Sequence, residues 1–281
     1  MTEGKRMRQK ADDSAPERTP ERQPAVATAD AATIVTDAIE AVLARAAGYL
    51  DAFRAVHLRG PSGTGKTTLS RLLAQRLGRP VVLAEGDGMR ALMLACAEGS
   101  TLVIDGPAPP PSLAGVLGEG TLTLGDGALT VHQGFRAIIV TSPATPLHDA
   151  LADRVMTIDC DGFDRETEIA IAAAGSGLSG TEVARIVDMV RDFRRSREYT
   201  DRPSLRCSIM LARMVALLGC AVSAEDGAFI ALVLDRLGAR LRTGPDGLPD
   251  PRHRQMLIKL IGHFCGTHGA AVGQRMQGIA A

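Results

Sequence analysis

One stretch of the chain has the residue types and the spacing of a phosphate-binding loop. Residues 60–67, Gly-Pro-Ser-Gly-Thr-Gly-Lys-Thr, satisfy the pattern G-x-x-x-x-G-K-[ST] at every fixed position. Glycine lets the backbone adopt positive φ and turn its N–H groups toward an anion, and the start of a following helix favours the same negative charge. The pattern therefore predicts a nucleotide phosphate site at Gly60, Pro61, Ser62, Gly63, Thr64, Gly65, Lys66, Thr67 and Thr68.

Side chains in and beyond this loop are expected to bind phosphate and a metal ion. Lys66 is expected to reach the β and γ phosphates, and the Thr67 hydroxyl suits Mg²⁺, which keeps several waters and takes oxygens from the nucleotide. The apolar stretch 101–104 ends at Asp105, and a strand beside the glycine-loop strand presents such an acid to the outer side of the ion. The alternative is that Asp105 merely ends a strand at a turn. ATP and Mg²⁺ are thus the expected ligands, with Thr67 and Asp105 on the metal side.

The flanking segments alternate between strand and helix patterns. A helix is expected from about Ala31 to Leu50, with Asp30 as its N-cap, before a strand at 53–58 and a helix at 69–77. The chain from Asp164 onward has only helical patterns. The remaining expected elements are strands at 81–83, 101–105, 135–143 and 155–159, a hairpin of 120–124 with 129–132, and helices at 91–97, 149–154, 183–193, 204–218, 223–237 and 251–265. This order predicts an α/β core followed by a helical part.

Composition excludes several classes of protein. With 281 residues, 45% hydrophobic content and equal numbers of basic and acidic residues (32 each), the chain can fill a sizeable core and has no overall charge for binding nucleic acid or a membrane. The five cysteines form no C-x-x-C pair and are expected to be buried thiols in a reducing compartment. A basic cluster is interpreted as a solvated helix face, or alternatively as a surface for an acidic protein partner: Arg191, Arg194, Arg195 and Arg197.

The N-terminal segment 1–28 is rich in charge and proline and has almost no apolar periodicity. It is expected to be disordered, as a solvated tail or as a basic docking arm. It has no apolar stretch of the kind found in signal peptides, so no export is expected.

An ordered set of short motifs resembles the GvpN family of gas vesicle proteins, MoxR-type members of the AAA+ ATPases. The resemblance runs from about Phe53 to Ala216 and rests on residues 58–69, 120–124, 135–138, 150–159, 164–168 and 202–206. It implies a three-layer P-loop core at 29–162, an all-helical lid at 163–267 and a flexible tail at 268–281. It also implies ring assembly, usually hexameric, with ATP at subunit boundaries, and a cytoplasmic and gas vesicle location with shell or assembly proteins as partners.

The same resemblance assigns roles to individual residues. Lys66, Thr67 and Asp105 match the phosphate and magnesium residues. Arg154 aligns with the arginine finger that enters a neighbouring subunit's site, where a guanidinium neutralises charge on the transferred phosphoryl group. Arg206 aligns with the lid arginine that couples nucleotide state to lid angle. The alternative for both arginines is an ordinary surface ion pair.

The chain departs from the family at the position of the water-activating acid. Members carry Asp-Glu where this chain has Asp105-Gly106, and usually an asparagine near Ser142. Loss of a general base typically costs about 10²–10⁴-fold in rate. The leading hypothesis is an AAA+ ATPase that remodels gas vesicle shell proteins, with weak turnover. The alternatives are a hydrolysis-impaired ATP-binding scaffold or switch, and a small-molecule P-loop kinase, which leaves the helical part and Asp153-Arg154 unexplained.

Overall fold

The computed structural model describes residues 34–85, 88–106, 108–125, 127–243, 247 and 251–266. The expected tails 1–28 and 268–281 lie outside these ranges, as does the expected N-cap Asp30.

A parallel sheet forms the centre of the N-terminal part. In the described residues it has the order β2-β3-β6-β1-β7, and every neighbouring pair is parallel. Parallel strands joined by crossovers end at the same edge of a sheet, so the loops that follow β1, β3 and β6 meet there. The strands are β1 (Ala55–Arg59), β2 (Val81–Leu83), β3 (Thr101–Asp105), β6 (Arg136–Thr141) and β7 (Met156–Asp159).

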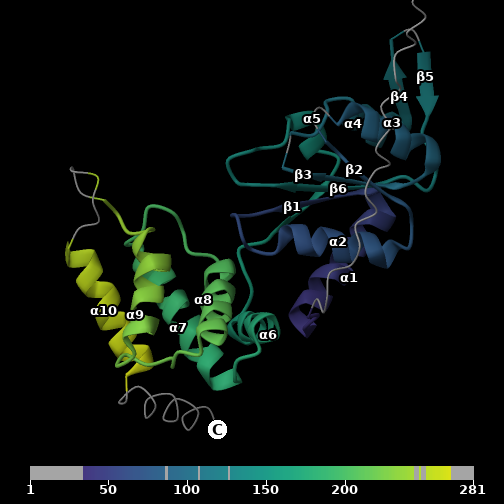
Figure 1. The fold of residues 1–281 in the computed structure, drawn as a ribbon. Coiled ribbons are helices and arrows are strands. Elements are labelled where there is room, and N and C mark those ends of the chain that lie inside the picture. Colours follow the sequence, from purple (N-terminus) through teal and green to yellow (C-terminus); the bar gives the residue numbers. More distant parts are fainter. Residues whose placement is uncertain are drawn as a thin grey trace, which may run out of the picture.

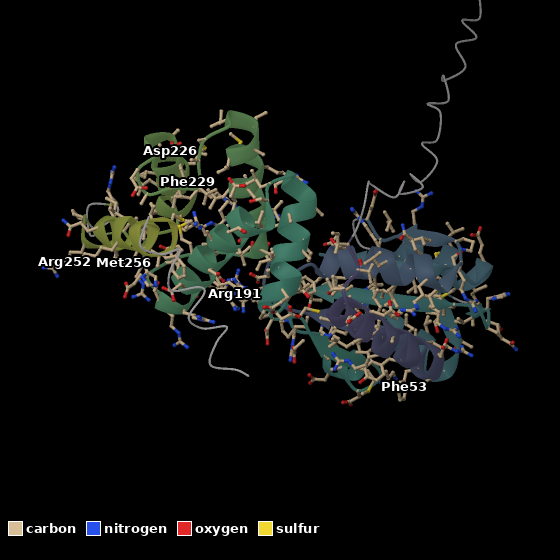
Figure 2. All side chains as sticks on the ribbon, turned by 90° about the horizontal axis from the view of Figure 1, so that it is seen from below. Phe53, Arg191, Asp226, Phe229, Arg252 and Met256 are labelled. Carbon is tan, nitrogen blue, oxygen red and sulfur yellow. The ribbon has the colours of Figure 1, made fainter. Side chains whose placement is uncertain are left out.

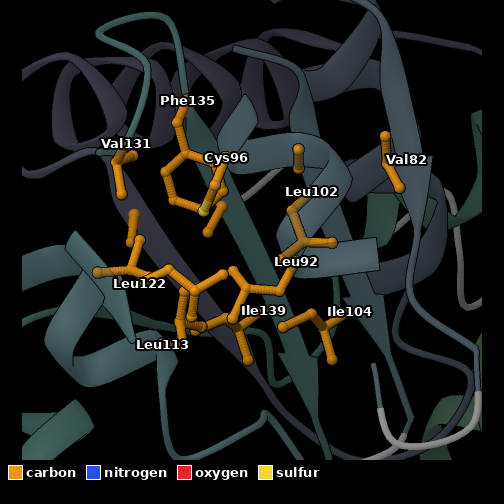
Figure 3. Packing of buried hydrophobic residues seen from close by; sticks show 14 of the residues in the cluster. Val82, Leu92, Cys96, Leu102, Ile104, Leu113, Leu122, Val131, Phe135 and Ile139 are labelled. Atoms are coloured by element: carbon orange, nitrogen blue, oxygen red, sulfur yellow. The ribbon is translucent and has the colours of Figure 1, made fainter. Parts of the chain in front are cut away.

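Helices cover both faces of this sheet and give three layers (Figure 1). The alternation of side chains along a strand explains the arrangement: Leu102 and Ile104 of β3 pack in one apolar cluster, shown in Figure 3, and Val103 packs in the cluster on the other face. One face carries α1 (Asp37–Phe53) and α2 (Lys66–Leu77), and the other carries α3 (Met89–Glu98), α4 (Leu113–Glu119) and α5 (Asp149–Ala152). The expected α/β core is confirmed.

The expected hairpin is also present, between α4 and β6. Its antiparallel strands are β4 (Thr121–Leu124) and β5 (Gly127–Thr130). The second strand therefore begins earlier than the sequence pattern indicated. Figure 1 shows the hairpin projecting from the core.

The C-terminal part is helical and has its own apolar core. Helix α7 begins with the capping box of Ser179 and Glu182, and its Phe193 is fully buried in a cluster with Phe229 of α9. Figure 2 shows Phe229 and the α10 residue Met256 in this part, on the side away from the sheet. The elements are α6 (Arg165–Ser176), α7 (Gly180–Ser196), α8 (Leu205–Leu218), α9 (Gly227–Val233), the π-helical turn η1 (Leu234–Gly238) and α10 (Pro251–Cys265). We call α6 to α10 the helical lid.

Several element boundaries differ from the expected ones. Helix α1 begins at Asp37 because Thr36 is its N-cap and accepts a hydrogen bond from the Ile39 backbone. Phe53 ends α1 rather than starting β1, since Arg54 adopts a left-handed φ of 60° that terminates the helix. Helix α2 begins at Lys66, directly after the loop glycines, and not at residue 69.

The cysteines mostly follow expectation. Cys96, Cys160, Cys207 and Cys265 are buried free thiols, while Cys220 is half-buried. Burial raises the pKa of Cys96, Cys160 and Cys265 to about 11. Within the described ranges, no helix is long and apolar enough to cross a membrane, and no cluster of His, Cys, Asp and Glu has the composition of a metal site.

Candidate functional site

The glycine-rich loop connects β1 to α2 at the carboxyl edge of the sheet. Gly63 and Gly65 have φ values of 76° and 89°, which residues with a side chain rarely adopt. Gly65 is the N-cap of α2, and no side chain caps this helix start. The first N–H groups of α2 therefore point into the loop with the positive end of the helix dipole, an arrangement that binds phosphate.

Lys66 is held across this loop by a backbone carbonyl. Its Nζ donates to the carbonyl oxygen of Pro61 at 2.7 Å, and the hydroxyl of the buried Thr64 donates to the same oxygen at 3.0 Å. Desolvation lowers the pKa of Lys66, partly offset by Cys160 and Asp105. The ammonium group is thus positioned inside the loop, while Ser62, Thr67 and Thr68 are exposed at its surface.

Thr67 and Asp105 meet beside the loop. The Thr67 Oγ1 donates to Asp105 Oδ2 at 2.6 Å, although 38 positions separate the two residues. Asp105 is the last residue of β3, and β6 lies between β3 and β1 in the sheet. The structure therefore brings together a hydroxyl and a carboxylate, the hard oxygen ligands that suit Mg²⁺.

The helical lid and the segment leading to it contact the loop at two glycines. A Cβ on Gly63 would lie 2.2 Å from Ser204 Oγ, and one on Gly65 would lie 2.8 Å from the ring of Phe163. On the strand side, a Cβ on Gly60 would lie 2.2 Å from the carbonyl oxygen of Cys160. These glycines are needed because the chain passes close on three sides of the loop.

Arg206 lies close to the loop and Arg154 does not. Arg206 is in the first turn of α8, with its Cβ 3.9 Å from the position of a Cβ on Gly63. Arg154 follows α5, on the face of the sheet opposite α2 (Figure 1). Its Nη1 donates to the Ala150 carbonyl at 2.5 Å, and it packs against Gly118 of α4. Both side chains are exposed, and neither forms an ion pair with another of the described residues.

The position after Asp105 is open but conformationally restricted. Gly106 has a φ of 107°, and a Cβ there would meet nothing within 4 Å. Glycine adopts this φ readily because it has no Cβ, whereas L-residues rarely do. Ser142 directly follows β6 and is hydrogen-bonded to Thr145 at 3.2 Å. Glu85, Asp87 and Glu119 are the nearest acids that could replace the missing glutamate; Glu85 and Glu119 are exposed, and Asp87 is outside the described residues.

A cavity with both apolar and polar lining adjoins the loop, and no sequence pattern predicts it. Its volume is about 140 Å³. Thr64 of the loop and the chain after β7 contribute to its wall, with residues of α1 and α2. It is lined by Ala38, Val42, Thr64, Leu69, Ile158, Asp159, Cys160, Gly162, Phe163 and Asp164. The chain has only 3% aromatic residues, so the presence of Phe163 is the one sequence feature that could have indicated this cavity.

A buried histidine joins three strands under the site. His57 of β1 is 3% exposed, and its ring nitrogens form hydrogen bonds to Thr141 of β6 at 2.8 Å and Thr157 of β7 at 3.0 Å. Burial, helped by the charge of Arg59 and opposed by Asp159, lowers the pKa of His57 to about 4. The neutral ring therefore fixes the relative positions of the strands that carry the loop and the Ser142 segment.

The basic cluster on α7 is not the solvated face that the sequence suggested. Arg194 Nη1 lies 2.9 Å from Glu168 Oε1, and Arg191 Nη1 lies 3.4 Å from Glu168 Oε2. The Glu168 side chain is only 1% exposed. That interpretation was wrong for these two arginines because their acidic partner comes from the preceding helix, α6, which their own spacing does not reveal.

Comparison with known proteins identifies relatives along most of the chain. It is 34% identical to the gas vesicle ATPase GvpN of Ancylobacter aquaticus in an alignment of 303 residues including gaps, which covers 88% of this chain and 85% of that protein. It is 31% identical to the gas vesicle ATPase GvpN2 of Halobacterium salinarum and 30% identical to the gas vesicle ATPase GvpN of Haloferax mediterranei, each over 64% of this chain and 67% of the relative. No family model matches the chain. These identities and their coverage show that the chain belongs to the GvpN family of gas vesicle ATPases.

Proposed function

We propose that the chain binds ATP at the glycine-rich loop and hydrolyses it in the formation of gas vesicles. The observation that carries the proposal is the convergence of Lys66, Thr67 and Asp105 at the N-terminus of α2, with Thr67 and Asp105 2.6 Å apart. The loop also lies between a strand, β1, and a helix, α2, which is the context that this glycine pattern requires. Membership of the GvpN family supplies the link to gas vesicles.

The residues of the site have separate roles in this proposal. The N–H groups of the loop and the Lys66 ammonium hold the β and γ phosphates. Thr67 and Asp105 would hold Mg²⁺, and both are oxygen donors of the kind that the ion requires. When bound, Mg²⁺ neutralises charge on the phosphate oxygens. Arg206, beside Gly63, is suited to sense the phosphates from the lid.

The cavity next to the loop is the proposed site of the adenine base. It shares Thr64 with the loop, so a nucleotide whose phosphates lie on the loop can reach it. The part of its wall formed by Val42, Leu69 and Phe163 suits the faces of a flat heterocycle. Phe163 belongs to both the loop contact and the cavity wall.

The exposed Arg154 supports assembly of several copies around shared sites. Its own glycine loop lies on the other side of the sheet. Its exposed guanidinium, held to the Ala150 carbonyl, would enter the site of a neighbouring copy and neutralise charge on the transferred phosphoryl group. We propose a homo-oligomeric ring, a core at 29–162, a lid at 163–267 and shell or assembly proteins as partners. The proposed location is the cytoplasm and the gas vesicle, without nucleic acid or membrane as a partner.

Slow turnover follows from the residue at position 106. No carboxylate follows Asp105, and the φ of 107° at Gly106 disfavours any side chain there. In this proposal the residues that bind ATP are all present, while the water-activating group is absent from its usual place. The alternative proposal, a nucleotide-dependent scaffold or switch that scarcely hydrolyses ATP, is favoured by this one observation.

Phosphate release tests the proposal. The chain should release phosphate from Mg-ATP, and Lys66→Ala should abolish release because the phosphates lose their main cation. Lys259→Ala, which removes an exposed lysine of α10, is the charge-matched control and should match the unmodified chain. Release that persists in Lys66→Ala contradicts the proposed site. No release from an unmodified chain that binds ATP supports the scaffold instead.

A further inference from the structure

A buried carboxylate of the lid is shared by two arginines of the next helix. Glu168, in the first turn of α6, is 1% exposed, while the side chains of Arg191 and Arg194 on α7 are 22% and 13% exposed. Arg194 donates to Glu168 Oε1 at 2.9 Å, and Arg191 lies 3.4 Å from Oε2. We call these three residues the lid ion cluster. Figure 2 shows Arg191 between α10 and the core.

Each arginine of the lid ion cluster also holds a backbone carbonyl outside α6 and α7. Arg191 Nη1 donates to the carbonyl oxygen of Phe163 at 3.1 Å. Arg194 Nε donates to the carbonyl oxygen of Pro203 at 2.8 Å. The two carbonyls lie 40 positions apart in the chain, one before α6 and one before α8, and the single Glu168 carboxylate connects their donors.

These two carbonyls belong to the segments that press on the glycine-rich loop. The Phe163 ring is the group that would meet a Cβ on Gly65, and Ser204, next to Pro203, is the group that would meet a Cβ on Gly63. Glu168 and Arg194 also line a cavity with loop residues. Its lining is Pro61, Ser62, Gly63, Thr64, Asp161, Gly162, Phe163, Glu168, Arg194, Arg202, Pro203, Ser204 and Leu205.

Stability alone does not account for such a cluster. A buried ion pair repays its desolvation only with good geometry and further hydrogen bonds, and well-packed apolar residues are often at least as stabilising. Here Glu168 Oε2 and Arg194 Nη2 are buried without a hydrogen-bond partner among the described residues. The cluster instead fixes the orientation of the groups that the arginines bind, because a planar guanidinium donates several N–H groups in fixed directions at once.

We infer that Glu168, Arg191 and Arg194 are positioning residues for nucleotide binding: the cluster holds Phe163 and Ser204 against the two loop glycines. None of the three needs to touch ATP. The inference rests on the proposed function, since it assumes that ATP occupies the loop. ATP affinity then depends on a charge cluster within the lid as well as on the groups that contact phosphate.

The variant Glu168→Gln tests this inference on the full chain. It keeps the shape of residue 168 but removes the charge that orients both arginines. The control is Asp188→Asn. Asp188 pairs with Arg165 at 2.6 Å and also joins α6 to α7, but this pair is more exposed, and among the described residues the Asp188 side chain hydrogen-bonds only Arg165. We expect calorimetry with Mg-ATP to give an affinity about tenfold lower for Glu168→Gln, a size typical of coupling between sites, and an unchanged affinity for Asp188→Asn.

A purely structural role predicts a different pattern. It would lower the urea midpoint of Glu168→Gln and leave the affinity of the folded protein unchanged, and that result overturns the inference. If Glu168→Gln does not fold, Arg194→Lys decides the question, because lysine keeps a positive charge near Glu168 but loses the donor to Pro203. It should weaken Mg-ATP binding several-fold, and unchanged binding overturns the inference. If the unmodified chain binds no Mg-ATP, the proposed function fails, and this inference fails with it.

Discussion

Substitution of Gly63 by alanine should measure how closely the lid is pressed on the glycine-rich loop. The left-handed φ of 76° would be strained by a Cβ, at a cost of about 1–2 kcal/mol. The added Cβ would also lie 2.2 Å from Ser204 Oγ and 2.6 Å from Ser204 Cβ. Rotation of the serine side chain relieves only the first of these contacts. The start of α8 must therefore retreat by roughly 1 Å to restore ordinary contact distances.

The control for this substitution is Gly78→Ala. Gly78 ends α2 with a φ of 60°, and a Cβ there meets nothing within 4 Å. Its free energy of unfolding should fall only by the cost of the strained backbone conformation, about 1–2 kcal/mol. Overpacking typically costs a further ~1–3 kcal/mol, so Gly63→Ala should lose about 2–5 kcal/mol in total.

The assay is urea unfolding of the two variants and of the double variant Gly63→Ala/Ser204→Gly. Ser204 makes no side-chain capping bond to α8, so its replacement by glycine costs little and removes both clashing atoms. The double variant should regain the stability that Gly63→Ala loses through overpacking, so its free energy of unfolding should be close to that of Gly78→Ala. Equal losses for Gly63→Ala and Gly78→Ala, or no recovery in the double variant, would refute the reasoning.

Three further predictions follow from the site and the core. Arg154→Ala should bind Mg-ATP normally but lower phosphate release by the assembled protein on the order of 10³-fold, and unchanged release removes its proposed role. For His57, the unfolded chain binds the proton first as pH falls from 6.5, because the folded pKa is about 4; stability should therefore be complete above pH 6.5 and fall by on the order of 3 kcal/mol toward pH 4. Urea titrations across this range should give a steeper loss for the unmodified chain than for His57→Phe. Under native conditions a thiol reagent should label the half-buried Cys220 before the buried thiols Cys96, Cys160, Cys207 and Cys265, as peptide mass spectrometry can record; equal labelling of all five would contradict the described packing.

The sequence predicted the core well because its signals are local. Residues 101–104 and the stretch from Phe135 are apolar runs of strand length, and both form buried strands. The glycine pattern fixes a loop conformation within a few residues, and the last helix lies at Pro251–Cys265 as expected. Predicted element boundaries were wrong where more than one residue could cap a helix. At the start of α1 the sequence indicated Asp30 as the N-cap, whereas the structure has Thr36 there.

Contacts between distant segments could not be predicted in the same way. Nothing local to Arg194 indicates that its partner is Glu168, 26 positions earlier. The contact of Ser204 with Gly63 likewise depends on how the lid packs on the core. Sequence patterns give the elements and one face of each, while the pairing of faces requires the three-dimensional structure.

Calorimetric titration with Mg-ATP tests the central claim most directly, because it measures binding without requiring turnover or assembly. We predict a saturable heat of binding for the unmodified chain and for Lys259→Ala, and none for Lys66→Ala. An absence of binding heat from folded, unmodified protein, or the same heat from Lys66→Ala, would contradict the assignment of the glycine-rich loop as the nucleotide site.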